Sequence, residues 1–261
     1  MQSIDIDGTA IHYRFSPGRT GERVVVFINS LGTDFRIWDD VIAELGAPYL
    51  VYDKRGHGLS AVGPTPYSIE ALAQDLADLM DRLEISGAII CGLSVGGQIA
   101  QQLYHDRPDL VAGLILCDTA AKIGEPEFWQ QRIATIAEQG LAAVTDGIME
   151  RWFSAAFRHE GGAQYAIARA MFERQPVEGY LATCAAIAAF DRRDDAANIA
   201  VPTAVLVGSL DGATPPDVVE SFAGLINGST FQIIDGAGHL PCIEAPGAVA
   251  AALAALQARI Q

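Results

Sequence analysis

The chain has 261 residues, half of them hydrophobic, and its 32 acidic against 17 basic side chains give a formal net charge of −15. Nucleic acid and anionic membranes repel a chain of this charge, so neither is expected as a partner. No apolar run approaches the ~18 residues of a membrane span. The first residues also lack the basic start and apolar core of a secretory signal. We therefore expect a cytoplasmic protein that is long enough to bury a sizeable core.

Strand-like and helix-like patterns alternate along most of the chain. Two short alternating segments precede an apolar run over 24–28, which is typical of a strand covered on both faces. Amphipathic patterns predict helices over 37–45 and over 69–83, the second with Ser68 as N-cap. This alternation predicts the α/β class, a mostly parallel sheet with helices on both faces. Further strands are predicted over 49–52, 88–91, 111–117, 203–207 and 230–234, and further helices after Ser94, after Pro216 and over 246–260.

The stretch 122–195 differs from the rest, because it has helical patterns, clusters of aromatic residues and no convincing strand. We predict a helical cap here, inserted between two segments of one core domain, 1–121 and 196–261. Ligands of open α/β sheets bind at the carboxyl ends of the strands, so the cap is expected to cover that end. For each of its aromatic residues, taken individually, the pattern favours the cap core over a binding role: Phe128, Trp129, Trp152, Phe153, Phe157, Phe172 and Tyr180.

A strand and a helix meet at the sequence Gly92-Leu93-Ser94-Val95-Gly96. A serine in such a sharp strand-to-helix bend is lifted clear of the sheet with its hydroxyl exposed. Glycine at 92 and 96 removes side chains that would clash where the helix crowds the strand. The helix N-terminus also stabilises a developing oxyanion. The pattern predicts Ser94 as a catalytic nucleophile.

Two later strand ends offer an acid and a base. Asp211 comes just after a buried strand, and His239 lies in a glycine-rich loop after the last strand. The chain order Ser94, Asp211, His239 is the order of nucleophile-elbow hydrolases. His239 would take the serine proton and return it to the leaving group, while Asp211 would hold the imidazole tautomer.

Other assignments are open for these roles. Asp118 also follows a strand and is the alternative acid, whereas Asp235 is expected to shape the turn before His239. His57 lies between two glycines, which favours a structural role in a turn. The remaining histidines have no strand end or glycine loop that would direct them at Ser94: His12, His105 and His159.

The N–H groups of Val95 and of Leu31, in the loop after the third strand, are the expected oxyanion donors. A serine nucleophile excludes the reactions on this fold that require an aspartate there, such as epoxide or haloalkane hydrolysis. Neither a metal nor an organic cofactor is implied. The four cysteines form no C-x-x-C pair and are expected to be buried, reduced thiols: Cys91, Cys117, Cys184 and Cys242.

With these residues in place, the sequence resembles the α/β-hydrolase superfamily over essentially the whole chain. It is most similar to the 3-oxoadipate enol-lactonases, which serve the protocatechuate and catechol branches of the β-ketoadipate pathway in aromatic degradation. Val95 departs from the methionine usual there, and 238–241 resembles the general superfamily ending. The similarity is carried by residues 29–34, Trp38 and Asp39, 52–58, and in the cap by 118–124, Trp129, Arg132, 151–153, 178–180 and Cys184.

The resemblance implies hydrolysis of a five-membered enol-lactone with an acetate arm, through an acyl-enzyme on Ser94, to give 3-oxoadipate. The acetate carboxylate needs a cation, and the cap offers Lys122, Arg132 and Arg151. Arg132 is our first choice, since it lies in the family-like segment and arginine binds carboxylates through two hydrogen bonds. Three further residues are expected at the substrate: Ser30, Trp129 and Trp152.

Other functions are compatible with the same fold. A general carboxylesterase or perhydrolase would use the same triad on neutral esters and would have no use for the cap cations. A C–C bond hydrolase would act on larger diketones in a wider pocket. A non-catalytic ligand-binding protein has no need to keep all three triad residues, and a fluorophosphonate label on Ser94 would separate it from an enzyme. Pocket size and oligomeric state are not determined by the sequence.

Overall fold

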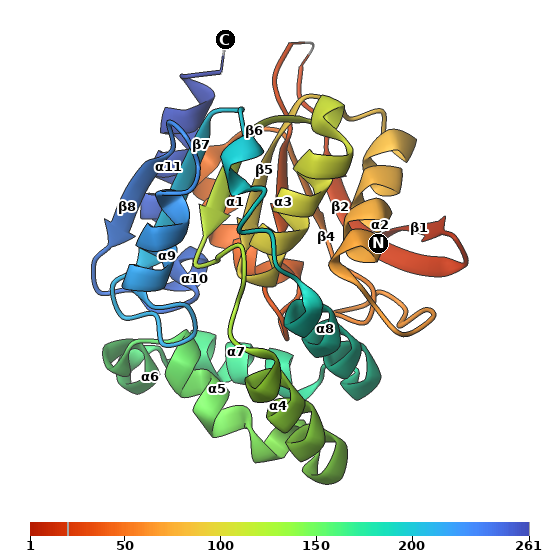
Figure 1. Ribbon diagram of the computed structural model, residues 1–261, viewed down its shortest axis with the longest axis vertical. Coiled ribbons are helices and arrows are strands. Elements are labelled where there is room, and N and C mark those ends of the chain that lie inside the picture. Colours follow the sequence, from red (N-terminus) through yellow and green to blue (C-terminus); the bar gives the residue numbers. More distant parts are fainter. Residues whose placement is uncertain (20, 261) are drawn as a thin grey trace.

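The computed structural model describes residues 1–19 and 21–260. Within them an eight-stranded sheet has the order β1-β2-β4-β3-β5-β6-β7-β8 (Figure 1). β2 runs antiparallel to both of its neighbours, and all strands from β4 to β8 run parallel. The strands are β1 (Gln2–Ile6), β2 (Thr9–Ser16), β3 (Val25–Ile28), β4 (Tyr49–Tyr52), β5 (Ala88–Leu93), β6 (Val111–Cys117), β7 (Thr203–Gly208) and β8 (Thr230–Ile234).

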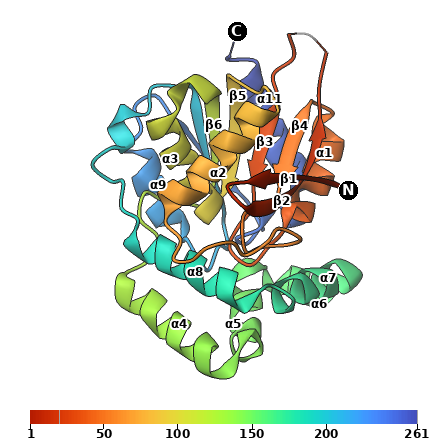
Figure 2. The same ribbon diagram turned by 90° about the vertical axis from the view of Figure 1, so that its right-hand side faces the viewer.

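Helices cover both faces of this sheet (Figure 2). α1 (Asp39–Leu45) and α11 (Pro246–Gln257) pack together on one face, and α2 (Ile69–Arg82), α3 (Val95–Asp106) and α9 (Pro216–Ala223) lie on the other. Every residue of the central strands β3 and β5 is buried, as the continuous apolar runs predict. The predicted α/β fold, with a mostly parallel sheet between two helical layers, is confirmed.

Most predicted elements are present, with changes at their ends. Ser68 caps α2 as expected, since its Oγ accepts a hydrogen bond from the N–H of Ala71 at 3.1 Å. The segment predicted as one helix over 37–45 begins as a 3-10 turn, η1 (Phe35–Trp38), because the Asp34 side chain caps that turn. The last helix ends at Gln257 rather than at 260. Short elements not predicted are η2 (Pro108–Leu110), η4 (Ala196–Asn198) and α10 (Pro241–Glu244).

Five helices between β6 and β7 lie together beyond the carboxyl ends of the parallel strands (Figure 1). We call these helices the cap. No strand interrupts them in the described chain, as the sequence predicts, and α4 packs along α8. The exact division into core and cap segments stays a prediction. The cap helices are α4 (Pro126–Gln139), α5 (Thr145–Trp152), α6 (Ala155–Glu160), α7 (Gly162–Glu173) and α8 (Val177–Ala189), with a 3-10 turn η3 (Leu141–Ala143) after α4.

The expectations about cysteines and membrane spans can also be compared with the structure. All four cysteines are buried and carry free thiols. Across residues 1–19 and 21–260, no helix combines the length and apolar character that crossing a bilayer requires.

Candidate active site

Ser94 lies at the bend between β5 and α3 with φ 58° and ψ −120°. A positive φ costs a residue with a side chain roughly 1–3 kcal/mol, and such strain persists only where neighbouring contacts impose it. Here the Ser94 N–H donates to the Cys117 carbonyl at 2.9 Å, and Thr119 Oγ1 donates to the Ser94 carbonyl at 2.6 Å. β6 and the loop after it therefore hold the strained bend in place.

The glycines around Ser94 are required by close approach of the backbone. A Cβ atom at Gly92 would lie 2.3 Å from the carbonyl oxygen of Gly96, and one at Gly96 would lie 2.3 Å from that of Ile28. Both distances are far below van der Waals contact. The reason inferred from the sequence for glycine at these two positions is therefore confirmed.

Asp211 and His239 form a buried hydrogen-bonded pair. His239 Nδ1 lies 2.9 Å from Asp211 Oδ2. The other Asp211 oxygen accepts the N–H groups of Ala213 at 2.7 Å and Thr214 at 3.0 Å, and Thr214 Oγ1 donates to Oδ2 at 2.6 Å. Burial raises the pKa of Asp211, but the His239 charge and the hydrogen bonds outweigh it, so the pKa lies below the ordinary value. With Nδ1 held by a carboxylate, Nε2 of His239 is the ring nitrogen left for proton transfer.

Asp118, the alternative acid, lies next to this pair. Single polar atoms of Asp118, Asp211 and His239 all lie within 4.8 Å of one another, and Asp118 Oδ1 accepts the Gly208 N–H at 2.9 Å. Burial, followed by the neighbouring Asp211 charge, raises the pKa of Asp118 well above its ordinary value. Of the two candidate acids, Asp211 is the one that bonds to the imidazole, and burial beside the Asp211 charge disfavours ionisation of Asp118.

A cavity of about 300 Å³ lies between these core loops and the cap. Ser94 and His239 both line it, together with Ser30 and Leu31 from the loop after β3. The cap forms the facing wall with two groups of side chains, aromatic rings and guanidinium groups. They are Phe128, Trp129, Arg132, Arg151, Trp152 and Tyr180. The cavity thus brings the predicted nucleophile and base together with most of the predicted substrate-binding residues.

Of the two predicted oxyanion donors, Leu31 lines this cavity, and Val95 directly follows Ser94, which lines it. Neither the Leu31 N–H nor the Val95 N–H donates a hydrogen bond to another group within residues 1–19 and 21–260. Val95 is the first residue of α3, where the initial N–H groups have no partner inside the helix. Two backbone N–H groups without a partner, one directly after Ser94 and one in a loop that lines the same cavity, suit a tetrahedral oxyanion.

Arg132 and Arg151 differ from two other cap arginines in their partners. Arg158 and Arg169 pair with acidic side chains, but no carboxylate of the described chain lies within 4.0 Å of the Arg132 or Arg151 guanidinium. Both guanidinium groups contact the Phe128 ring instead, at 4.7 and 4.9 Å from its centroid. Burial and the nearby Arg132 charge lower the pKa of Arg151. Two neighbouring guanidinium groups without a carboxylate partner at a cavity wall are chemically suited to an anion.

Some candidates lie elsewhere. Lys122 is not a lining residue, and its ammonium group pairs with Glu125, so we leave it out of the proposed substrate site. His57 is buried outside the cavity, with Nδ1 3.4 Å from the Arg55 carbonyl oxygen. The other histidines are also outside the cavity: His12 bonded to Asp53, His105 beside Asp106, and His159 exposed.

Two groups of site residues were missed by reasoning from sequence. Thr214 holds Asp211, and its position three residues after an aspartate is a recognisable turn pattern that could have indicated this contact. Phe128 and Tyr180 were assigned to the cap core, yet both line the cavity. No pattern within the cap sequence distinguishes these rings from those that pack inside it.

Known proteins share the sequence pattern and the fold of this chain. The model of the alpha/beta hydrolase family matches residues 25–252. The chain is 33% identical to 3-oxoadipate enol-lactonase 2 of Acinetobacter baylyi over 93% of its own length and 91% of that protein. It is 35% identical to 3-oxoadipate enol-lactonase 1 of the same organism, over 85% and 84% of the two chains. The solved structure of the enol-lactonase from Burkholderia xenovorans LB400 superposes with a TM-score of 0.94 at 35% identity, over 98% of this chain and all of that one.

The chain therefore belongs to the alpha/beta hydrolase family. It is similar to 3-oxoadipate enol-lactonases, and it is an enzyme of the class that hydrolyses carboxylic esters.

Proposed function

We propose that this protein opens an enol-lactone that carries a carboxylate arm, 3-oxoadipate enol-lactone, to 3-oxoadipate through an acyl-enzyme on Ser94. The observation that carries the proposal is one cavity that holds two kinds of groups. Ser94 and His239 line its core side, and Asp211 is hydrogen-bonded to His239. Two guanidinium groups without a carboxylate partner line its cap side. The similarity to enol-lactonases supports the same substrate.

In the first step Ser94 Oγ attacks the lactone carbonyl carbon, and His239 Nε2 accepts the hydroxyl proton. Asp211 stabilises the imidazolium that forms, and the N–H groups of Leu31 and Val95 stabilise the oxyanion. Collapse of the tetrahedral intermediate breaks the ring C–O bond. The released enol oxygen receives the proton from His239, and the enol converts to the ketone.

In the second step water attacks the acyl-enzyme carbonyl, and His239 now acts as the base for that water. The C–O bond to Ser94 breaks, the serine recovers its proton, and the new carboxylate leaves. The net reaction adds one water to the lactone and produces a dicarboxylate.

The two arginines supply selectivity for the anionic arm. Arg132 is the first choice for the acetate carboxylate, and Arg151 lies beside it with no other anion to bind. Trp129 and Trp152 wall the cavity, where their rings exclude water from the lactone. A neutral ester would leave both guanidinium groups unpaired, so the cavity favours an anionic substrate.

The test follows loss of enol-lactone absorbance with purified protein, beside a neutral p-nitrophenyl ester and with Ser94→Ala as control. Fast lactone turnover, slow ester turnover and an inactive variant are expected. Fast ester turnover with little action on the lactone would identify a general esterase instead. Activity that survives in Ser94→Ala would refute the nucleophile. Failure of a fluorophosphonate to label the wild-type protein would indicate a non-catalytic binding protein.

A further inference from the structure

Lys54 is a buried lysine with no obvious reason to be buried. It follows β4, its side chain is 1% exposed, and it does not line the cavity. No carboxylate of the described residues lies within 4.0 Å of its amine. Lysines are almost never fully buried unless paired, so this one needs an explanation.

The Lys54 amine donates to two backbone carbonyls of the loop after β3, which we call the oxyanion loop (residues 29–34). Nζ lies 2.7 Å from the Ser30 oxygen and 3.2 Å from the Asn29 oxygen. β3 and β4 are parallel neighbours with Ile28 paired to Tyr52, so the loops that follow them leave the sheet side by side. Burial lowers the pKa of Lys54 to about 7, against the raising effect of Asp53 and Asp34. Even a neutral amine keeps two N–H donors, which match these two acceptors.

The Ser30 carbonyl and the Leu31 N–H belong to the same peptide group. A trans peptide is planar, and its C=O and N–H point in opposite directions; the peptide between Ser30 and Leu31 is trans. A donor that fixes the Ser30 oxygen therefore fixes the direction of the Leu31 N–H. The same hydrogen bond polarises the peptide and strengthens its N–H as a donor.

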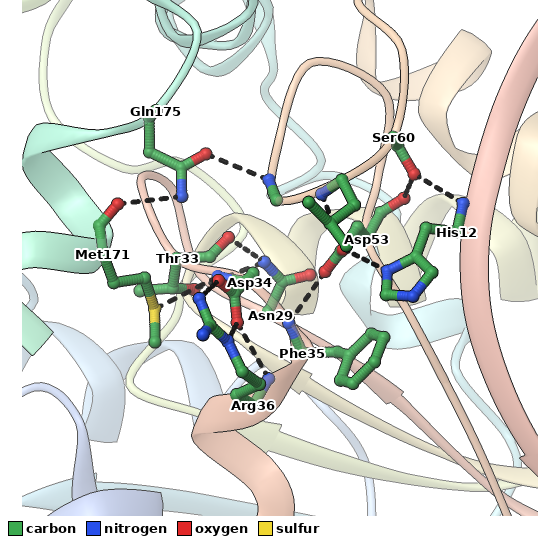
Figure 3. A network of polar contacts seen from close by, with 12 residues as sticks. His12, Asn29, Thr33, Asp34, Phe35, Arg36, Asp53, Ser60, Met171 and Gln175 are labelled. Atoms are coloured by element: carbon green, nitrogen blue, oxygen red, sulfur yellow. Dashed lines mark hydrogen bonds and ion pairs between the residues drawn. The ribbon is translucent and has the colours of Figure 1, made fainter. Parts of the chain in front are cut away.

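A polar network anchors the rest of the oxyanion loop and Phe35, the residue after it (Figure 3). Asp53 accepts the Phe35 N–H at 2.9 Å and pairs with His12 Nδ1 at 2.8 Å, and Ser60 Oγ donates to the Asp53 carbonyl at 2.5 Å. At the start of the loop, the Asn29 side chain donates to the Thr33 carbonyl. These contacts hold the loop as a whole, and the Asn29 amide also lies near the Ser30 carbonyl, with Nδ2 3.5 Å from its oxygen, at the limit of hydrogen-bond length. Two groups of Thr33, within the loop, donate to the same oxygen, Oγ1 at 3.0 Å and the backbone N–H at 3.4 Å. The Lys54 amine is closer, at 2.7 Å, and reaches the oxygen from another loop.

We propose that Lys54 is a positioning residue for oxyanion stabilisation, which directs the Leu31 N–H at the cavity by holding the Ser30 carbonyl from the opposite side. The proposal rests on the proposed function, in which Leu31 supplies an oxyanion donor. Lys54 acts through the backbone and touches neither substrate nor reacting atoms. It should therefore affect the transition state more than the ground state.

The test replaces Lys54 by Met, which keeps length and burial but donates nothing, and by Gln, which keeps a shorter donor. Ser60→Ala is the matched control, because it removes a buried anchor of the same region without touching Ser30. Loss of an oxyanion donor costs about 100- to 1000-fold in kcat. Since Lys54→Met would misdirect the donor rather than remove it, we expect a fall of about 10- to 100-fold in kcat with KM changed less than threefold.

Phenylboronic acid gives a second readout, since its tetrahedral adduct on Ser94 places an oxygen where the oxyanion forms. Its affinity should weaken by the same factor as kcat in Lys54→Met, less in Lys54→Gln and little in Ser60→Ala. A kcat loss in Ser60→Ala as large as in Lys54→Met would overturn the proposal. So would unchanged boronic acid affinity, or a failure of both Lys54 variants to fold, since each indicates a general structural role.

Both the enol-lactone and the p-nitrophenyl ester are used as substrates, which separates this proposal from the proposed function. If the wild-type protein prefers the neutral ester, the lactonase assignment fails but the effect of Lys54 is still measured. If Ser94→Ala stays active, the proposed function and the role of Lys54 both fail.

Discussion

Replacement of Arg132 by Met tests whether the cap cations select a carboxylate. Methionine keeps an apolar stem against Phe128 and Trp129 and removes only the charge and the donors. A hydrogen bond to a charged group contributes about 1.5–3 kcal/mol, and each 1.4 kcal/mol is tenfold. We therefore expect kcat/KM for the enol-lactone to fall by about 10- to 150-fold. Arg151 remains beside the position that Arg132 leaves, so the decrease in kcat/KM for the single variant should lie toward the lower end of this range. The double variant with Arg151→Met should show a larger decrease.

The assay compares the enol-lactone with the same lactone carrying a methyl ester in place of the carboxylate. The neutral analogue should react with wild-type protein and Arg132→Met at rates within about threefold, because it has no charge for the guanidinium to bind. Arg174→Met is the matched control, since Arg174 is an exposed cap arginine outside the cavity. Equal losses on both substrates would show that Arg132 supports the fold rather than the arm. Equal kcat/KM values of the wild-type enzyme for the two substrates would refute the reasoning.

Three further changes test the support of the site. Gly96→Ala places a Cβ 2.3 Å from the Ile28 carbonyl oxygen, and should lower the free energy of unfolding by about 1–3 kcal/mol or more. Gly147→Ala is the control and should not destabilise the protein, because a Cβ there has no atom within 4 Å. Equal melting temperatures of the two variants would contradict this expectation. Thr214→Val removes the hydroxyl that donates to Asp211. Urea titration should therefore give a free energy of unfolding about 1.5–3 kcal/mol lower than that of the wild type. A decrease of less than about 0.5 kcal/mol would mean that this hydrogen bond contributes little. Asp118 keeps its proton in the folded state at pH values where the unfolded chain has lost it, so its contribution to stability falls as pH rises above about 4. Asp118→Asn cannot lose a proton, and its stability relative to wild type should rise from pH 4 to pH 8; a constant difference would contradict a raised pKa.

Local order in the chain made the fold and the candidate catalytic residues predictable. The strand, bend and helix around Ser94 are adjacent in sequence. The glycines at 92 and 96 indicate the close approach of the backbone that the bend requires. Asp211 and His239 were found because each follows a strand, and parallel strands present their carboxyl ends at one edge of the sheet. The alternation of helix-like and strand-like periodicity, together with the glycines and prolines that end the elements, was sufficient to predict these positions.

The choice among similar side chains depended on contacts between distant segments. Asp118 and Asp211 both follow strands, and β6 and β7 are neighbours, so both carboxyls reach the same place. Only the packing around His239 determines which of them bonds to the imidazole. In the cap, the sequence offers three candidate cations, Lys122, Arg132 and Arg151, and local patterns do not show which of them face a cavity. Lys122 finds Glu125 three residues along, whereas the two arginines are left without a carboxylate at the cavity wall.

The sequence by itself therefore determined the α/β architecture, the helical segment between β6 and β7, the proposed nucleophile Ser94 and the proposed base His239, because short local patterns encode all of them. Only the tertiary structure decided which acid meets the histidine, which cations face the cavity, and that Lys54 reaches the Ser30 carbonyl. The physical reason is that side-chain pairing depends on distances between segments that lie far apart in the chain, and local patterns carry no information about those distances.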